Sequence, residues 1–475
     1  MSGQAPAKEA IAILDVGKTH TKLAIVDAMT GATLRGHERP SVPIPSPLGP
    51  QLDVQGIEEW LLDRFAATPE ASRLRAIVPI AHGAAAVLLD RVGAVLAAPD
   101  YENPVFEEVR QAYRVLRDDF SVTFSPFLGR GLNLGRQLYW LQTRSPDLFE
   151  RCDQILTYPQ YWAWRLSRVA ACEWTSLGCH TDLWRPLAQK PSLLAVAQGW
   201  ADRMAPVRAA GDTLASVDPE WARKATLDPK CRVLCGMHDS SASYLALGAP
   251  FAPGGEPHTV VSSGTWTICM TSGRIPVQRL AEDRDMLANV DVAGQPVATA
   301  RFAGGREYRA IVGAEGETVL ADEAELPSVL QSKAMVIPSF SSDGGPFAGR
   351  IGQLIRAERL TATGRVALAS LYLALMTDLL LGWLGAHGDI VVDGPLADNA
   401  VYTQALACLR LNQCVKRSDR RQAMVYAGLH LAGFAVDRSM VTVSASRVAM
   451  VDALHDYRLY WRRLLPNGAV RRCVS

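Results

Sequence analysis

A strand, a tight polar turn and a second strand are predicted twice in this chain, once in each half. The first pattern spans residues 10–27, where apolar runs flank a turn at Gly17, and the second begins at Thr259 and turns at Gly264. Apolar segments around a glycine-bearing turn are typical of buried hairpins. A chain of 475 residues exceeds one typical core, so the repeat predicts two related α/β domains. We place the boundary where Gly and Pro cluster, giving domains 1–248 and 249–475.

Both turns carry small and hydroxylated residues. The first contains Gly17 and Thr19, and the second contains Ser263, Gly264 and Thr265. Such residues let backbone N–H and hydroxyl groups approach a phosphate closely. Each turn alone fits an ordinary polar turn. Two such turns in one chain favour phosphate contact.

Two carboxylates accompany these turns. Asp15 ends the first strand, where it can face a metal ion, and Asp239 follows His238 some two dozen residues before the second turn. A carboxylate near a phosphate can act as a general base towards a hydroxyl. The alternative for Asp239 is the N-cap of a helix over 240–245, because Asp is a good N-cap. The pattern as a whole predicts phosphoryl transfer to a hydroxyl.

Four segments in this order resemble the motifs of the FGGY carbohydrate kinases. Residues 15–22 resemble the first phosphate motif, 236–239 the catalytic-base segment, 262–266 the second phosphate motif and 391–399 the adenosine motif. The pair His238-Asp239, followed by Ser-Ser-Gly-Thr-Trp, is most similar to the rhamnulose and fuculose kinase branch. The resemblance implies two actin-like ATPase (ribonuclease H-like) α/β domains that face each other across a catalytic cleft.

The resemblance also implies an ATP-dependent kinase for a ketose. The substrate would be a 6-deoxyketohexose, L-rhamnulose or L-fuculose, and the product a 1-phosphate. Asp239 would be the catalytic base and would also contact the sugar, and Asp15 would orient Mg²⁺ through water. The remaining residues would bind the sugar (His82, Gly83, His238), the phosphates (Gly17, Thr19, Ser263, Gly264, Thr265) and the nucleotide (Gly394, Asp398, Asn399).

Several of these residues have structural alternatives. His82 fits a loop histidine that makes a turn contact, His238 fits a structural hydrogen-bonding residue, and Asn399 fits the N-cap of the following helix. Lys18 departs from the small residue usual in the family, and it would either add positive charge near the phosphates or point to water. Residues 301–308 form either a ligand loop or a surface loop with salt bridges.

Asp393 and Pro395 also depart from the family pattern, because they replace glycines that are usual in the adenosine loop. The predicted nucleotide contacts around Gly394 therefore rest on a weaker match than the phosphate contacts.

Charge and cysteine usage narrow the class of protein. Lys and Arg total 49 against 48 for Asp and Glu, a balance that argues against a nucleic-acid or anionic membrane surface and favours small-molecule ligands. Nine scattered cysteines, with no signal sequence, indicate a reduced, cytoplasmic protein. Residues 366–384 are apolar except for Asp378, and we expect a buried core helix rather than a membrane span.

Two further functions fit the same sequence. One is a kinase for a pentulose or a polyol, because substrate choice rests on a few side chains. The other is a non-catalytic sugar- or ATP-binding regulator on the same scaffold, which the presence of Asp15 and Asp239 argues against. The resemblance also allows a homodimer.

Overall fold

The N-terminal strand–turn–strand pattern forms an antiparallel hairpin of β1 (Ala10–Val16) and β2 (His20–Asp27), with Ile13 opposite Ala24. The N–H of Gly17 closes the turn by donating to the carbonyl of His20 over 3.0 Å. A Cβ at Gly17 would lie 2.9 Å from that carbonyl oxygen, so this turn favours glycine. The computed structural model describes residues 9–248, 257–272, 277–341, 344–418, 423–435, 440–443 and 448–465.

The chain divides into two compact units. The first comprises residues 1–246, 288–296 and 422–438, and the second comprises residues 247–287, 297–421 and 439–475. The predicted boundary at 248/249 falls at the edge of residues 249–256, which lie outside the described residues. Each unit therefore includes segments that are distant in sequence.

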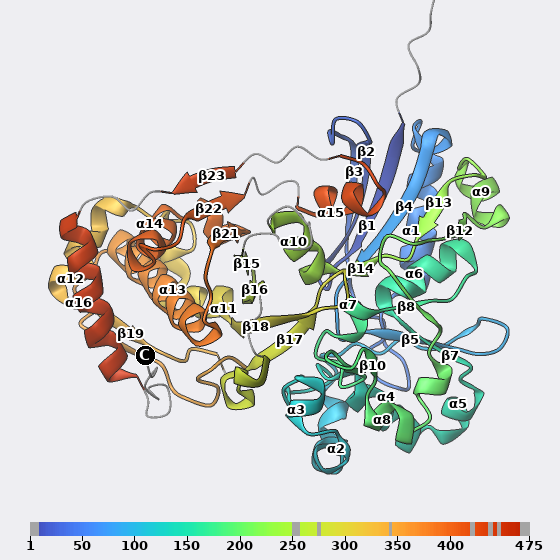
Figure 1. The fold of residues 1–475 in the computed structure, drawn as a ribbon, viewed down its shortest axis with the longest axis horizontal. Coiled ribbons are helices and arrows are strands. Elements are labelled where there is room, and N and C mark those ends of the chain that lie inside the picture. The colour runs from blue at the N-terminus through green and yellow to red at the C-terminus, as the bar shows by residue number, and fades with distance from the viewer. Residues whose placement is uncertain are drawn as a thin grey trace, which may run out of the picture. The chain divides into compact units, whose positions relative to one another are not determined.

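The hairpin lies inside the main sheet of the first unit (Figure 1). The strand order is β12-β13-β4-β1-β2-β3, with β4 (Leu74–Ala81) parallel to β1 and the short β14 (Met237–His238) paired to β4. The other strands are β3 (Thr33–Pro40), β12 (Thr213–Ser216) and β13 (Arg232–Leu234). The carboxyl ends of β1, β4 and β14 therefore meet at one edge of this sheet, because the three strands are parallel.

Helices α1 (Val54–Ala66), α6 (Tyr158–Ser167) and α9 (Pro219–Ala225) supply apolar side chains to the core of this sheet. The core includes Phe65, Trp162 and Trp221, each at most 2% exposed. Asp53 caps α1, since its Oδ1 accepts the N–H of Gly56 over 2.9 Å.

A second core in the first unit forms around Phe106, Trp140 and Trp200. The strands β5 (Ala86–Leu89), β6 (Val95–Ala97) and β7 (Gln154–Thr157) form its sheet. β5 and β6 pair antiparallel and form a hairpin. The surrounding helices are α2 (Arg110–Leu116), α4 (Leu134–Arg144), α5 (Pro146–Arg151) and α8 (Leu193–Ala197).

The sheet of the second unit repeats the strand order and directions of the first. Its order is β17-β18-β16-β15-β21-β22-β23, in which β15 forms a hairpin with β16 and runs parallel to β21, as β1 does with β2 and β4. The bounds are β15 (His258–Ser263), β16 (Thr267–Thr271), β17 (Met286–Val290), β18 (Pro296–Phe302), β21 (Asp389–Asp393), β22 (Val415–Ser418) and β23 (Met440–Val443). The predicted similarity of pattern between the halves is confirmed as a shared topology.

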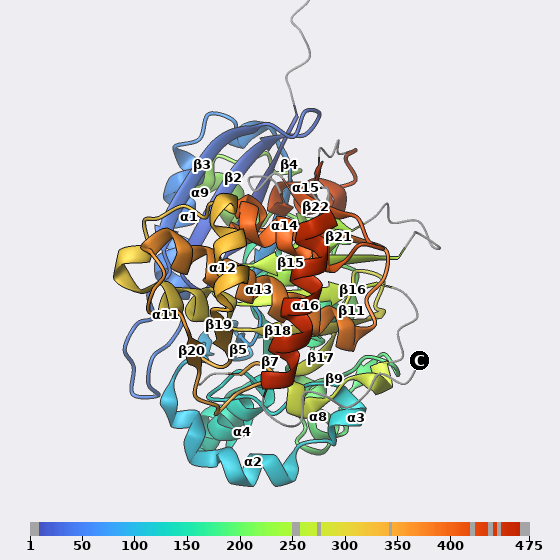
Figure 2. The same ribbon diagram turned by 90° about the vertical axis from the view of Figure 1, so that its left-hand side faces the viewer.

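The long helix α13 (Ala362–Leu384) packs against α11 (Gly304–Gly316) and α14 (Ala400–Leu409). The outer helices α12 (Leu326–Ser332) and α16 (Val448–Leu464) face the viewer in Figure 2. Among the described residues, α13 alone is long and apolar enough to cross a membrane, and 89% of its apolar 18-residue window is buried inside the protein. The predicted buried core helix is confirmed.

Candidate functional site

Asp15 occupies the second-last position of β1, at the sheet edge where β4 and β14 also end. Burial, together with the negative charges of Asp239 and Glu38 and against the opposing charge of Lys22, raises the pKa of its carboxyl to about 7. Asp15 and Asp239 therefore interact electrostatically, although 224 positions separate them in the sequence. The structure brings the two predicted carboxylates into one polar site of the first unit.

Lys18 forms an ion pair instead of pointing to water. Its Nζ lies 2.6 Å and 2.8 Å from the two carboxylate oxygens of the buried Asp100, and 5.1 Å from the ring centre of Tyr101. Glu102 adds a third carboxylate oxygen at 3.6 Å. The neighbouring Thr19 is exposed, with its hydroxyl 3.2 Å from Nδ1 of His20. The first turn is thus tied to the loop that follows β6.

Asp239 is the first residue of α10 (Asp239–Leu247), directly after β14. Its Oδ1 accepts the backbone N–H of Ser240 over 2.6 Å and lies 3.3 Å from the Ser240 hydroxyl. An N-cap carboxylate instead accepts the N–H two or three residues further on. The side chain is 31% exposed, so its carboxylate is open to a ligand.

His238 is buried beside Asp239. Its Nε2 lies 3.1 Å from Asp239 Oδ1 and 3.1 Å from Cys179 Sγ, and its backbone N–H donates to the hydroxyl of Thr175 over 3.1 Å. Burial lowers the pKa of the imidazole, against the smaller opposing effect of the Asp239 charge. A Cβ at Gly83 would lie 2.6 Å from Cys179 Sγ and 2.8 Å from His238 Nε2. Gly83 therefore leaves the room that both side chains occupy.

His82 follows β4 and is also buried. Its Nδ1 lies 2.9 Å from the carbonyl oxygen of Gly83, and its ring packs 5.8 Å from Tyr101 and 5.0 Å from Tyr158. Burial lowers the pKa of this imidazole too. The turn contact given as the alternative is present, and His82 also joins Lys18 and Tyr101 in a cluster next to the first turn.

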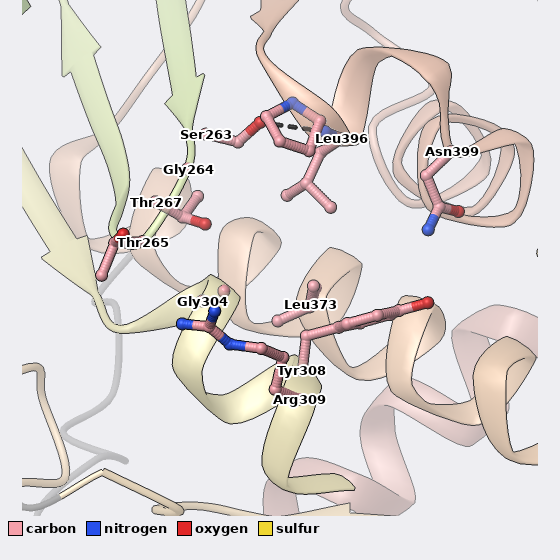
Figure 3. Close-up of a pocket in the computed structure, with 12 residues that line it drawn as sticks. Ser263, Gly264, Thr265, Thr267, Gly304, Tyr308, Arg309, Leu373, Leu396 and Asn399 are labelled. Carbon is pink, nitrogen blue, oxygen red and sulfur yellow. Dashed lines mark hydrogen bonds between the residues drawn. The ribbon is translucent and has the colours of Figure 1, made fainter. Parts of the chain in front are cut away.

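The second unit contains a cavity of about 420 Å³ beside the turn between β15 and β16 (Figure 3). Four of its lining residues are predicted site residues: Ser263, Gly264, Thr265 and Asn399. The other eight lining residues are not predicted individually as site residues, although three of them belong to the segment 301–308 with its ligand-loop alternative: Thr267, Gly304, Gly305, Tyr308, Arg309, Leu373, Pro395 and Leu396. Tyr308 and Arg309 of α11 lie across the cavity from Ser263 and Leu396 in Figure 3.

Ser263 and Gly394 connect this turn to the loop after β21. The hydroxyl of Ser263 donates to the carbonyl of Asp393 over 2.6 Å and accepts the N–H of Leu396 over 3.0 Å. Gly394 has a positive φ of 78°, and a Cβ there would lie 2.0 Å from the carbonyl oxygen of Ser263. Glycine at 394 therefore permits the close approach of the loop after β21.

Asn399 lines the cavity and also caps α14. Its Oδ1 accepts the N–H of Tyr402 over 2.9 Å, and its Nδ2 donates to the hydroxyl of Ser370 over 2.8 Å. The N-cap alternative is therefore observed. Asp398, the last residue of the short 3₁₀ helix η7 (Pro395–Asp398), is exposed and does not line the cavity.

Gly304 and Gly305 bring the start of α11 against the turn. A Cβ at Gly305 would lie 2.3 Å from the carbonyl oxygen of Gly264, and one at Gly304 would lie 2.2 Å from the hydroxyl of Thr267. This glycine pair after a predicted strand is the sequence signal behind the ligand-loop alternative for residues 301–308. Arg301 forms a buried ion pair with Asp285, with Nε 3.1 Å from Oδ2, so residues 301–308 combine a salt bridge with a cavity wall.

Residues 255–439 match the family model "Carbohydrate kinase FGGY, C-terminal domain". The chain is 35% identical to a carbohydrate kinase from Novosphingobium aromaticivorans, whose solved structure superposes with a TM-score of 0.88 over 98% of this chain and 100% of that one. A xylulose kinase from Rhodospirillum rubrum shares the fold at 16% identity, with a TM-score of 0.80 over 96% of this chain and 98% of that one.

A shorter alignment relates the chain to the L-fuculokinase of Haemophilus influenzae, at 29% identity over 137 residues. This alignment covers 28% of the present chain and only 27% of the curated relative. The full-length similarity to the solved carbohydrate kinase confirms the predicted fold of two actin-like ATPase domains. The chain therefore belongs to the FGGY family of carbohydrate kinases.

Proposed function

We propose that this protein transfers the γ-phosphate of ATP to a hydroxyl of a ketose, with Asp239 as the general base. The observation that carries the proposal is the placement of the Asp239 carboxylate, partly exposed at the start of α10, held by His238 and acting on Asp15. A base in this position takes the proton of the attacking hydroxyl, while positioning and charge neutralisation do most of the work of phosphoryl transfer.

The nucleotide binds in the cavity of the second unit. Its volume of about 420 Å³ lies within the range of small-molecule sites. Thr265 supplies donors to the phosphates, while the N–H of Gly264 closes the turn on the carbonyl of Trp266 over 2.9 Å. Tyr308 and Leu373 supply the apolar surface that a nucleoside needs.

Asp15 is the proposed ligand of Mg²⁺. Support comes from the electrostatic interaction of Asp15 with Asp239, which together with burial raises the pKa of the Asp15 carboxyl to about 7. A divalent cation next to Asp15 relieves this repulsion. The described residues contain no cluster of three or more His, Cys, Asp or Glu side chains arranged for a metal ion, which suits Mg²⁺, because this ion keeps several waters and uses one or two carboxylates plus the substrate phosphates.

The sugar is a neutral ketose, a 6-deoxyketohexose such as L-rhamnulose or L-fuculose, and the product is its 1-phosphate. Support comes from the alignment with L-fuculokinase and from the aromatic cluster of His82, Tyr101 and Tyr158, in which Tyr101 is half-buried. Asp100 neutralises the ammonium of Lys18, which argues against a sugar acid. Gly83 and the buried His238 pack behind Asp239, which makes the proposed contact with the attacking hydroxyl.

The test is ADP release by the full chain with MgATP and a panel of ketoses, aldoses, sugar acids and polyols. We expect turnover with L-rhamnulose or L-fuculose. Turnover with a pentulose or a polyol instead would keep the kinase and replace the substrate. ATP binding without turnover on any sugar would contradict the proposed activity and favour a regulator.

We predict that Asp239→Asn lowers kcat by about 10²- to 10⁴-fold, because the attacking hydroxyl loses its base. The affinity for the sugar should stay near the wild-type value, since the amide keeps the size and hydrogen-bonding oxygen of the carboxylate. Steady-state kinetics and calorimetric sugar titration measure the two quantities. The control is Asp63→Asn, an exposed carboxylate on α1. Wild-type turnover in Asp239→Asn would refute the assignment of the base.

A further inference from the structure

The thiol of Cys179 contacts the imidazole of His238, and this imidazole contacts Asp239, the proposed base. We propose that Cys179 is a positioning residue, which holds His238 so that its N–H orients the carboxylate of Asp239. The inference rests on the proposed function, in which Asp239 is the general base. Cys179 lies in the turn after the short helix α7 (Trp174–Leu177), 60 positions before Asp239.

The three groups form a contiguous chain of polar contacts. Nε2 of His238 is 3.1 Å from Cys179 Sγ on one side and 3.1 Å from Asp239 Oδ1 on the other. Cys179 and His238 are 2% and 4% exposed, whereas the Asp239 side chain is 31% exposed. The carboxylate therefore faces the ligand side, and the thiol and imidazole lie behind it.

The contacts fix the tautomer of His238. A carboxylate oxygen at 3.1 Å from Nε2 requires a proton on that nitrogen. Nδ1 is then the acceptor, and the hydroxyl of Ser241 lies 3.4 Å from it and 3.3 Å from the carbonyl oxygen of Val290, so its single proton is shared between these two acceptors. Because burial lowers the pKa of the imidazole, His238 stays neutral. A neutral N–H donor orients the Asp239 carboxylate without the full positive charge that would weaken it as a base.

His238 is held at its backbone and at its ring. The Thr175 hydroxyl accepts its backbone N–H over 3.1 Å, and the buried carboxylate of Glu173 in turn accepts that hydroxyl over 2.6 Å. On the Gly83 side, Cys179 Sγ fills the space next to Nε2. Truncating Cys179 would remove the atom that lies 3.1 Å from Nε2 and open a gap beside the ring. The ring could then turn away from Asp239.

The experiment compares Cys179→Ala and Cys179→Ser with the wild-type protein. We expect Cys179→Ala to lower kcat by about 10- to 100-fold, the loss typical of a misplaced catalytic group. The sugar KM should stay within about twofold, because the thiol lies behind the carboxylate. Cys179→Ser should recover most of the lost kcat, since the hydroxyl keeps a polar atom beside Nε2.

A double-mutant cycle with His238→Ala separates positioning from packing. If Cys179 acts through His238, then Cys179→Ala has no further effect on kcat once the imidazole is gone. Cys231→Ala is the matched control, because it truncates a fully buried thiol of the same unit that does not contact His238. We expect this control to lower thermal stability and leave kcat unchanged.

Three results would overturn the inference. They are an unchanged kcat in Cys179→Ala, additive effects with His238→Ala, or a failure of Cys179→Ser to recover activity while its melting temperature matches the wild type. A failure of the proposed function would look different. In that case the wild-type protein releases no ADP, or Asp239→Asn retains turnover.

Discussion

At the scale of single residues, burial decides the chemistry of the polar groups around Asp239. Asp15 and His238 are both shifted towards their neutral forms, because the interior disfavours charge. Lys18 forms an ion pair with the buried Asp100, with its Nζ 2.6 Å from Oδ2. The same residue types on the surface would all be ionised or solvated. A site with mixed neutral and charged groups follows from this burial.

We predict that Asp15→Asn raises the melting temperature of the ligand-free protein at pH 8 and leaves it nearly unchanged at pH 4. The pKa of Asp15 is raised from 3.8 to about 7 by folding, so the folded state binds the extra proton between these values. Stability is therefore lost as the pH rises through about 7, and the neutral amide avoids that loss.

Thermal unfolding in the presence of a chelator measures this effect across the pH range. Asp63→Asn, on the exposed face of α1, is the control and should show no such dependence. A destabilised Asp15→Asn at pH 8 would contradict the assignment of a buried, repelled carboxylate.

At the scale of elements, α13 shows how one buried carboxylate connects an apolar helix to its neighbours. Thr361 caps its start by accepting the N–H of Gly364 over 3.0 Å, and Gly385, with a φ of 64°, ends it. Nearly every side chain between them is buried, as expected for a helix that is apolar on all sides. Asp378 is the acidic exception, and it orders the helices around α13.

Asp378 binds arginines from two directions. Its Oδ1 lies 2.8 Å from Nε of Arg410, the residue after α14. Its Oδ2 accepts a hydrogen bond from Nη2 of Arg462 on α16 over 2.8 Å. Arg458 on α16 is a third partner at 3.6 Å. The carboxylate therefore ties α13 to the residue after α14 and to α16.

We predict that Asp378→Ala lowers the free energy of unfolding by about 3–5 kcal/mol, because removing one partner of a buried ion pair leaves uncompensated charges. Urea unfolding of Asp378→Ala and of a control variant measures the change in the free energy of unfolding. Asp389→Ala is the matched control, since it removes a half-exposed pair with Lys416 in the same unit and should cost about 0–1 kcal/mol. Equal losses in the two variants would show that the Asp378 cluster does not stabilise the helices.

At the scale of the whole molecule, the two units share one sheet topology and differ in what surrounds it. The first unit places Asp15, His82 and Asp239 near strand ends of its sheet. The second places a cavity beside its corresponding hairpin turn. The proposed sugar and nucleotide contacts therefore belong to different units, and substitutions should affect them separately.

We predict that Gly394→Ala weakens binding of a non-hydrolysable ATP analogue at least about tenfold and leaves sugar affinity unchanged. The added Cβ would lie 2.0 Å from the carbonyl of Ser263, and strain of about 1–3 kcal/mol at this loop distorts the cavity. Calorimetric titration of each ligand measures the two affinities.

Gly349→Ala is the matched control. Gly349 has a similar positive φ of 76°, but a Cβ there meets no atom within 4 Å. This variant carries the same backbone strain away from the cavity, and its nucleotide affinity should equal that of the wild type. Equal weakening of nucleotide binding in both variants would contradict the role of the loop after β21.

The local features of this chain could be predicted because short segments determine them. The hairpins at Gly17 and Gly264 and the helix around Asp378 depend on apolar periodicity and on turn residues within a few positions. Asn399 shows the limit of such prediction. The sequence favours a helix cap and a cavity residue equally. In the structure, the Oδ1 of Asn399 caps α14, and the residue also lines the cavity.

By itself, the sequence determined the two repeated strand–turn–strand patterns, the buried helix α13 and the residue types of the phosphate turns, because these depend on neighbouring residues. Only the tertiary structure decided that Lys18 pairs with Asp100, 82 positions away, and that Cys179 meets His238 across 59 positions. It also decided that Tyr308 and Leu373 share a cavity with Ser263. Such contacts depend on how strands and helices pack over long sequence distances, and a one-dimensional pattern does not encode that packing locally.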